Sequence, residues 1–292
     1  MRRVISSVLF LLVLGGCVRR WTETEVYVTA VNWTSDNKVV FVKEVITWQC
    51  EEIPPFISER AEVKSDEFYL CEINYDGTGL REICYLWDRP GGINAISSAG
   101  EWIVFSDNIY REIYVIKRDG TGLEKVGYGV NPDFSPDASR IVYEKPDSGI
   151  WIMDRDGGND HCIVSDPDAK YPAWSPDDTL IAYVIAKSET LHICDIFGNI
   201  LKTYTPLEGG WYESPDWAPK DTNAVIVAVN GRGWSEIVYL SNDTIKKDKV
   251  GWYAKWSPDG SRYISYDGSW YVIRRDGTNK WYLKDKIEGG EK

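Results

Sequence analysis

A short repeated phrase constrains the fold of this chain more than any other feature. A ring residue is followed by a hydroxyl residue, a proline and an aspartate in its clearest copies, such as Trp174-Ser175-Pro176-Asp177. Altered copies lack one or more of these residues, and one has isoleucine in place of the ring. The six ring positions are Trp33, Ile96, Phe134, Trp174, Trp217 and Trp256. They are 38 to 43 residues apart except for one step of 63, and a period near 40 residues indicates a repeat architecture.

Each repeat contains four short strand patterns separated by turns. In the clearest copy, Ser175-Pro176-Asp177 has turn chemistry and is followed by the apolar run at residues 180–184. Residues 191–196 alternate between apolar and polar, Phe197-Gly198-Asn199 turns again, and residues 200–204 close the unit. Four strands with turn signals this close together predict an all-β protein.

Six such units predict a six-bladed β-propeller of four-stranded antiparallel blades. The units resemble the TolB-type propeller repeat, a relative of the WD repeat. The resemblance lies in the Trp-Ser-Pro-Asp turn, the strand at residues 181–183, the strand at residues 113–115 and the Asp119-Gly120 turn. It covers residues 22–286. The second repeat departs from it by lacking both tryptophan and proline, and the first carries an insertion at residues 44–66.

Two ways of closing the ring are consistent with the sequence. Residues 24–29 are able to pair with the last blade as its outer strand. Alternatively, each blade is built from its own repeat, ending at Trp281-Tyr282. The second is favoured because the final repeat already contains four strand patterns.

The N-terminus has the pattern of an export signal. A basic start precedes an apolar stretch at residues 4–14, which is too short to span a bilayer. Leu14-Gly15-Gly16-Cys17 resembles the lipobox of bacterial lipoproteins, in which the cysteine is acylated after cleavage. We therefore expect a cleaved leader at residues 1–16, a lipidated linker at 17–21, the propeller at 22–286 and a flexible tail at 287–292. Membrane contact is expected only through the acyl chains, on an exported cell-envelope protein.

The charge of the chain excludes some partners. It has 33 basic and 45 acidic side chains, with a net charge of −12. Nucleic acids and anionic lipid surfaces select for lysine and arginine, so neither is an expected partner.

Export makes disulfides feasible, and one pairing is predicted. If the Asp76–Gly79 turn joins the two strands symmetrically, Cys71 lies directly opposite Cys84. The alternative is two free thiols at these positions.

Few residues have the pattern of a catalytic or metal site. His192 takes a column that aromatic rings fill in other repeats, so we expect a packed ring, and His161 is expected on an outer strand. No metal-binding, dinucleotide-binding or nucleophile-elbow motif occurs. We therefore expect no enzyme activity, no cofactor and no metal.

The two ends of the ring differ in character. The Trp-Ser-Pro-Asp and Asp-Gly turns lie at one end, here called the turn face, and the remaining links lie at the opposite end, the loop face. Aromatic and arginine residues gather in the loop-face links, as in recognition surfaces. The candidate binding residues are Trp48, Trp87, Arg89, Arg111, Tyr128, Tyr171, Trp211, Tyr212, Arg232, Trp234 and Trp252. The alternative is that these rings fill the wedges between blades.

Two functions follow as hypotheses. The resemblance implies a non-catalytic, lipid-anchored envelope scaffold that binds protein or peptide across the loop face or the central channel. The alternative is a propeller that binds or cleaves glycans, because tryptophan and tyrosine rings stack on sugars.

Overall fold

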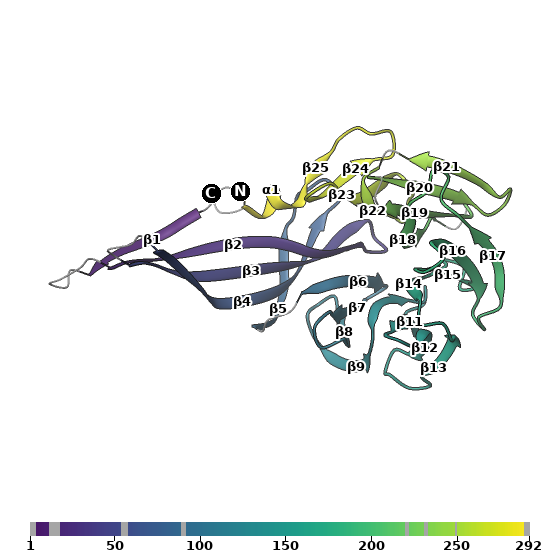
Figure 1. The fold of residues 1–292 in the computed structure, drawn as a ribbon, viewed down its shortest axis with the longest axis horizontal. Coiled ribbons are helices and arrows are strands. Elements are labelled where there is room, and N and C mark those ends of the chain that lie inside the picture. The colour runs from purple at the N-terminus through teal and green to yellow at the C-terminus, as the bar shows by residue number, and fades with distance from the viewer. Residues whose placement is uncertain are drawn as a thin grey trace.

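The chain forms a ring of six β-sheets with a long β-arm projecting from one side (Figure 1). This computed structural model describes residues 4–11, 18–53, 58–88, 92–219, 222–230, 233–248 and 250–288. Within them, no helix is long and apolar enough to cross a membrane. The predicted all-β six-bladed propeller is confirmed.

Each sheet is one blade, and its strands follow in chain order from the centre outward. Blade 1 contains β2 (Val18–Trp33), β3 (Lys38–Ile53), β4 (Ser58–Asn74) and β5 (Arg81–Asp88), with β1 (Val4–Leu11) paired to β2. Blade 2 contains β6 (Ile93–Ala99), β7 (Trp102–Asp107), β8 (Glu112–Lys117) and β9 (Glu124–Tyr128). Blade 3 contains β10 (Val130–Phe134), β11 (Arg140–Lys145), β12 (Gly149–Asp154) and β13 (His161–Val164).

The last three blades have the same order. Blade 4 contains β14 (Ala169–Trp174), β15 (Leu180–Ile185), β16 (Thr190–Asp195) and β17 (Ile200–Tyr204). Blade 5 contains β18 (Trp211–Trp217), β19 (Ala224–Asn230), β20 (Trp234–Tyr239) and β21 (Thr244–Asp248). Blade 6 contains β22 (Trp252–Trp256), β23 (Arg262–Tyr266), β24 (Trp270–Arg274) and β25 (Trp281–Tyr282), and α1 (Leu283–Glu288) follows it.

The repeated phrase is a structural turn between the first two strands of a blade. The buried Ser175 hydroxyl donates to Asp177 at 2.7 Å and accepts from the Leu180 backbone NH at 2.9 Å. Equivalent bonds form at Ser135 and Ser257. The phrase therefore maintains the hairpin register, as its turn chemistry predicts.

The turn between the third and fourth strands of blade 4 brings two neighbouring blades into close contact. Gly198 has φ +86°, and a Cβ placed there would stand 1.9 Å from the Ile163 carbonyl oxygen of blade 3. Only glycine permits both this conformation and this approach. Between the blades, apolar faces meet, as where Val184 and Leu191 of blade 4 pack with Val225 and Val227 of blade 5.

The insertion at residues 44–66 is a continuation of the blade rather than a loop. β3 and β4 remain paired along their whole lengths, and β2 pairs with β3 throughout. Their far halves form the arm that leaves the ring in Figure 1. Residues 45–48 are β-branched or aromatic, which favours continued strand pairing.

The ring closes without exchanging a strand. Blade 6 is made of its own four strands, and residues 24–29 lie in β2, which confirms the favoured alternative. The Trp281 indole NH donates to the Tyr75 carbonyl oxygen of blade 1 at 3.0 Å. Leu283 of α1 is buried in the apolar cluster between blades 6 and 1, where Ile287 also packs. Residues 287 and 288 thus belong to a packed helix, not to the predicted tail.

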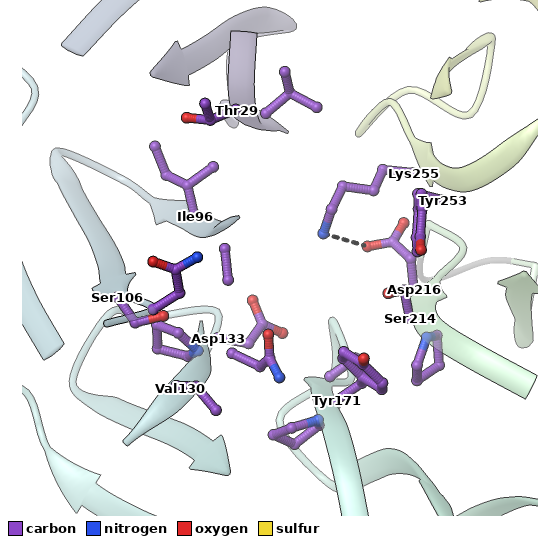
Figure 2. A pocket seen from close by; sticks show the side chains of 18 of the residues that line it. Thr29, Ile96, Ser106, Val130, Asp133, Tyr171, Ser214, Asp216, Tyr253 and Lys255 are labelled. Carbon is purple, nitrogen blue, oxygen red and sulfur yellow. Dashed lines mark ion pairs between the residues drawn. The ribbon is translucent and has the colours of Figure 1, made fainter. Parts of the chain in front are cut away.

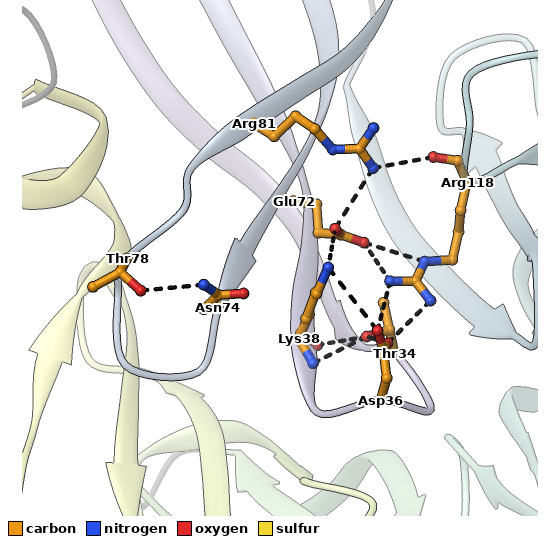
Figure 3. Close-up of polar contacts among 8 residues, drawn as sticks. All are labelled: Thr34, Asp36, Lys38, Glu72, Asn74, Thr78, Arg81 and Arg118. Atoms are coloured by element: carbon orange, nitrogen blue, oxygen red, sulfur yellow. Dashed lines mark hydrogen bonds and ion pairs between the residues drawn. The ribbon is translucent and has the colours of Figure 1, made fainter.

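An ion-pair network joins blade 1 to blade 2, whose repeat lacks the tryptophan and proline (Figure 3). The Glu72 side chain is 5% exposed; it binds Lys38 at 2.9 Å and accepts hydrogen bonds from Arg118. Arg118 also lies 3.0 Å from Asp36. Burial opposes ionisation of Glu72, but the bonds from Arg118 and Lys38 outweigh it and hold its pKa below the usual range.

The N-terminal segments differ from the expected linker. Residues 18–21, predicted as a linker, begin β2 on the arm, and Val4–Leu11 forms β1 against Val18–Thr24. Cys17 lies outside the described residues, so cleavage and lipidation there stay predictions.

The predicted Cys71–Cys84 disulfide is wrong. The strands do not leave the Asp76–Gly79 turn symmetrically: Cys71 already pairs with Glu82 instead of Cys84, and a β-bulge between Leu70 and Cys71 then pairs Cys84 with Leu70. The two thiols consequently belong to clusters on opposite faces of the sheet. Cys71, Cys84, Cys162 and Cys194 are free thiols.

Candidate functional site

The first strands of the blades surround a central channel that widens into a chamber of about 500 Å³ on the loop-face side. We call this the loop-side chamber (Figure 2). Its walls come mainly from residues of the six inner strands. They include Thr29, Ile96, Asn131, Asp133, Tyr171, Ser214, Asp216, Tyr253, Lys255 and Trp270.

A β-bulge in each inner strand shapes these walls. The ladder shifts register in β2, β6, β10, β14, β18 and β22 at corresponding places. Within four of these bulges, Asn131, Tyr171, Ser214 and Tyr253 have φ between 48° and 54°. A bulge re-aims the side chains beside it, and here Tyr171 and Tyr253 line the chamber.

The charged residues of the chamber share one position in the repeat, immediately before the ring residue. Asp133, Asp216 and Lys255 occupy this position in blades 3, 5 and 6. Asp133 accepts from the Trp174 backbone NH of blade 4 at 2.7 Å and from the Ser97 hydroxyl of blade 2 at 2.5 Å. The Asp133 carboxylate therefore also holds the inner strands of blades 2, 3 and 4 together.

Asp216 has the same type of contact but an incomplete set of partners. Its Oδ2 accepts from the Trp256 backbone NH of blade 6 at 2.8 Å. Its Oδ1 is 4.0 Å from Lys255 Nζ, which is beyond hydrogen-bond length. Burial raises the pKa of Asp216 to about 6, with Lys255 opposing the rise. Burial also raises the pKa of Asp133. The chamber is thus a site where negative charge is costly.

Four predicted binding residues are exposed on the loop face. Trp211 is 41%, Trp252 40% and Tyr128 50% exposed, and Arg111 is also exposed. The Trp211 indole NH donates to Glu213 at 3.0 Å, and the Tyr253 hydroxyl donates to the same carboxylate at 3.3 Å. These bonds connect the exposed Trp211 with the wall of the chamber.

Other predicted residues do not belong to this surface. Tyr212 is 1% exposed and donates its hydroxyl to Glu236, so its assignment to the binding face is wrong. The alternation of the strand turns Tyr212 inward where it turns Trp211 outward. Trp87 and Trp234 are half-buried, as the wedge alternative predicts. Trp87 packs against Phe105 of blade 2, and Trp234 packs against the apolar cluster between blades 4 and 5, with Lys247 over its ring.

Four of the predicted binding residues remain. Trp48 lies on the arm opposite Glu23 and Val63, because the insertion extends the blade outward. Arg89 and Arg232 lie outside the described residues. Of the predicted residues, Tyr171 is the one that lines the chamber.

The sequence reasoning missed the three charged residues of the chamber. The signal for them was present, since the position before the ring residue varies between aspartate, lysine, asparagine and alanine. In a repeat whose neighbouring positions hardly change, a position with varying charge is one that the fold does not specify. That variation would have identified Asp133, Asp216 and Lys255 as candidates.

The histidines are where the repeat alignment places them. His192 stacks on Tyr183 with ring centroids 5.4 Å apart, and burial lowers its pKa. His161 is exposed on β13. Throughout the described part of the chain, no group of three or more histidine, cysteine or carboxylate side chains is arranged to hold a metal ion.

Comparisons with known proteins agree with the architecture. The chain is similar to a putative TolB from Agrobacterium tumefaciens, with a TM-score of 0.61 and 19% identity over 72% of this chain and 86% of that one. It is also similar to a chain of a mitotic checkpoint complex, with a TM-score of 0.56 and 12% identity over 88% and 90%. A chain of a nidogen/laminin complex is similar with a TM-score of 0.51 and 12% identity, over 76% of this chain and 91% of that one.

The sequence comparisons add no relative. A scan against protein-family profiles finds no match. A comparison with the curated proteins finds none either. At these identities the structural likeness establishes a TolB-like propeller fold and nothing further about function.

Proposed function

We propose that this protein is a non-catalytic, lipid-anchored scaffold of the cell envelope that binds a protein or peptide across the loop-face mouth of its channel. The observation that carries the proposal is the pair of exposed tryptophans, Trp211 and Trp252, beside an open chamber. Large exposed rings around a concave site are the usual anchors of protein interfaces.

The proposed partner class has further support from the neighbours. Two of the similar chains come from structures described as complexes, the mitotic checkpoint complex and the nidogen/laminin complex. Fold analogy alone is a weak argument for function, so the exposed rings carry the proposal.

The proposed anchor fits the position of the arm. Cys17 directly precedes Val18, the first residue of β2 at the far end of the arm (Figure 1). Residues 18–28 of an extended strand span about 35 Å. Acyl chains on Cys17 would therefore hold the propeller away from the bilayer and leave its loop face accessible. Metabolic labelling with palmitate tests this, and label retained by Cys17→Ser would refute it.

Partner capture from envelope extracts tests the binding surface. Trp211→Ala and Trp252→Ala remove exposed rings without opening the core, so both variants should remain folded and lose at least about tenfold of the captured partner. Phe197→Ala is the matched control, because this ring is 77% exposed on a turn at the other end of the strands. Capture that is equal for all four proteins would refute the assignment of this surface.

Glycan binding is the second candidate. It is favoured by the exposed Trp211 ring, whose neighbour Glu213 also accepts from Asn230 at 2.9 Å, a combination of stacking and polar groups suited to a sugar. A glycan array distinguishes the two. Specific sugar binding that is lost in Trp211→Ala would favour this candidate over a protein partner.

A further inference from the structure

The loop-side chamber contains three charged side chains at its inner end. Asp133, Asp216 and Lys255 all line it, and Figure 2 shows both carboxylates directed into the same space. With all three ionised, their net charge is −1. The ammonium group lies 4.0 Å from Asp216, while the carboxylate of Asp133 accepts hydrogen bonds from a hydroxyl and a backbone NH.

Lys170, the second lysine of the six inner strands, is paired elsewhere. Lys170 binds the buried Glu144 at 2.7 Å, and Glu144 also accepts from Asn131 at 2.9 Å. Carboxylates removed from water without a counter-charge are costly to the fold, and they attract a cation from solution.

The walls favour an organic cation over a metal ion. Tyr171 and Tyr253 present rings to the chamber, and aromatic faces attract ammonium and guanidinium groups. The described residues hold no group of three metal-binding side chains, here or elsewhere. A chamber of about 500 Å³ has room for one long side chain.

We propose that the loop-side chamber accepts the protonated amine or guanidinium of a lysine or arginine side chain from a bound peptide, between Asp133 and Asp216. This inference rests on the proposed function and names the chemistry of the ligand that it recognises. Lys255 limits the site to one such group, because it already offsets one of the two carboxylates.

Calorimetric titration with a blocked pentapeptide, acetyl-Gly-Ser-Lys-Ser-Gly-amide, tests the proposal at low ionic strength and pH 8. Matched peptides have norleucine or glutamate in place of the lysine, and n-butylammonium represents a free amine. The lysine peptide should bind at least about tenfold more tightly than the norleucine peptide, and the glutamate peptide should not bind. Preference for the glutamate peptide, or equal affinity for n-butylammonium, would overturn the proposal.

Two substitutions give opposite expectations. Asp216→Asn keeps an acceptor for the Trp256 NH and removes a charge, so it should weaken binding by about tenfold. Lys255→Met removes the competing cation and should tighten binding several-fold. Asp276→Asn, at an exposed turn, is the matched control and should change nothing. Weaker binding in Lys255→Met, or unchanged binding in Asp216→Asn, would overturn the proposal.

The outcome is separable from that of the proposed function. Capture of an envelope partner that needs Trp211 and Trp252 but not Asp216 would leave the scaffold role intact and refute the cation site. If the protein neither captures an envelope partner nor binds the lysine peptide, both the scaffold role and the cation site are refuted.

Discussion

Asp216→Asn is expected to make the protein more stable at alkaline pH, although it removes a charged group that lies near a lysine. The side chain is 22% exposed, and its Oδ2 accepts from the Trp256 NH. An asparagine oxygen accepts the same bond, so the substitution changes charge with little change of shape.

The magnitude follows from proton linkage. Burial raises the pKa of Asp216 from 3.8 to about 6. Between these values the folded protein holds a proton that the unfolded chain has released, so stability falls as the pH rises through this window. Above pH 6 the full cost is present, and a difference of roughly 2 pH units corresponds to about 3 kcal/mol. Asparagine does not titrate and avoids this cost.

Thermal unfolding followed by circular dichroism measures the effect. At pH 8 the variant should unfold about 6 °C higher than the parent, at about 2 °C for each kcal/mol in a domain of this size. At pH 4 the two should unfold within about 1 °C of each other, because Asp216 is then protonated in the parent. A lower midpoint at pH 8, or the same difference at both pH values, would refute the reasoning.

The control has the opposite sign. A hydrogen bond from the Thr278 hydroxyl lowers the pKa of Asp276, so its ionised form is favoured by folding. Asp276→Asn should therefore lower the midpoint slightly at pH 8. If Asp216→Asn is more stable and also binds the lysine peptide less well, the chamber exchanges stability for recognition, as functional sites often do.

Three further predictions concern the frame of the propeller. Glu72→Gln should lower the free energy of unfolding by about 3 kcal/mol, because it leaves Arg118 without its buried carboxylate partner. The unfolding midpoint should fall by about 6 °C. Gly198→Ala should be at least about 2 kcal/mol more destabilising than Gly277→Ala in denaturant unfolding. Both glycines have positive φ, but only at position 198 would the added Cβ meet the Ile163 carbonyl oxygen. Equal effects of the two substitutions would contradict the close approach. Thiol titration of the unfolded chain beginning at residue 18 should count five thiols before and after reduction, and a lower count before reduction would indicate a disulfide.

Local patterns in the sequence predicted the elements that depend on local chemistry. The turn at Ser175 and Asp177 and the glycine at position 198 are specified by hydrogen bonds and backbone angles within a few residues. The pairing of Cys71 was not predictable in this way, because the geometry of the turn sets the register of every pair that follows it, and here the turn does not join the strands symmetrically. The different exposure of the adjacent rings of Trp211 and Tyr212 was not predictable either, because it depends on which side of the strand faces the core.

The sequence by itself determined the number of blades, their strands and their turns, because each repeat carries its own hydrogen-bonding and hydrophobic pattern. Only the tertiary structure decided which residues meet at the centre. In the sequence, Asp133, Asp216 and Lys255 are separated from one another by about 40 residues or more. They converge because six inner strands surround one axis. Closure of the ring buries these charges together, and that burial raises the pKa of Asp216. No pattern within a single repeat contains that information.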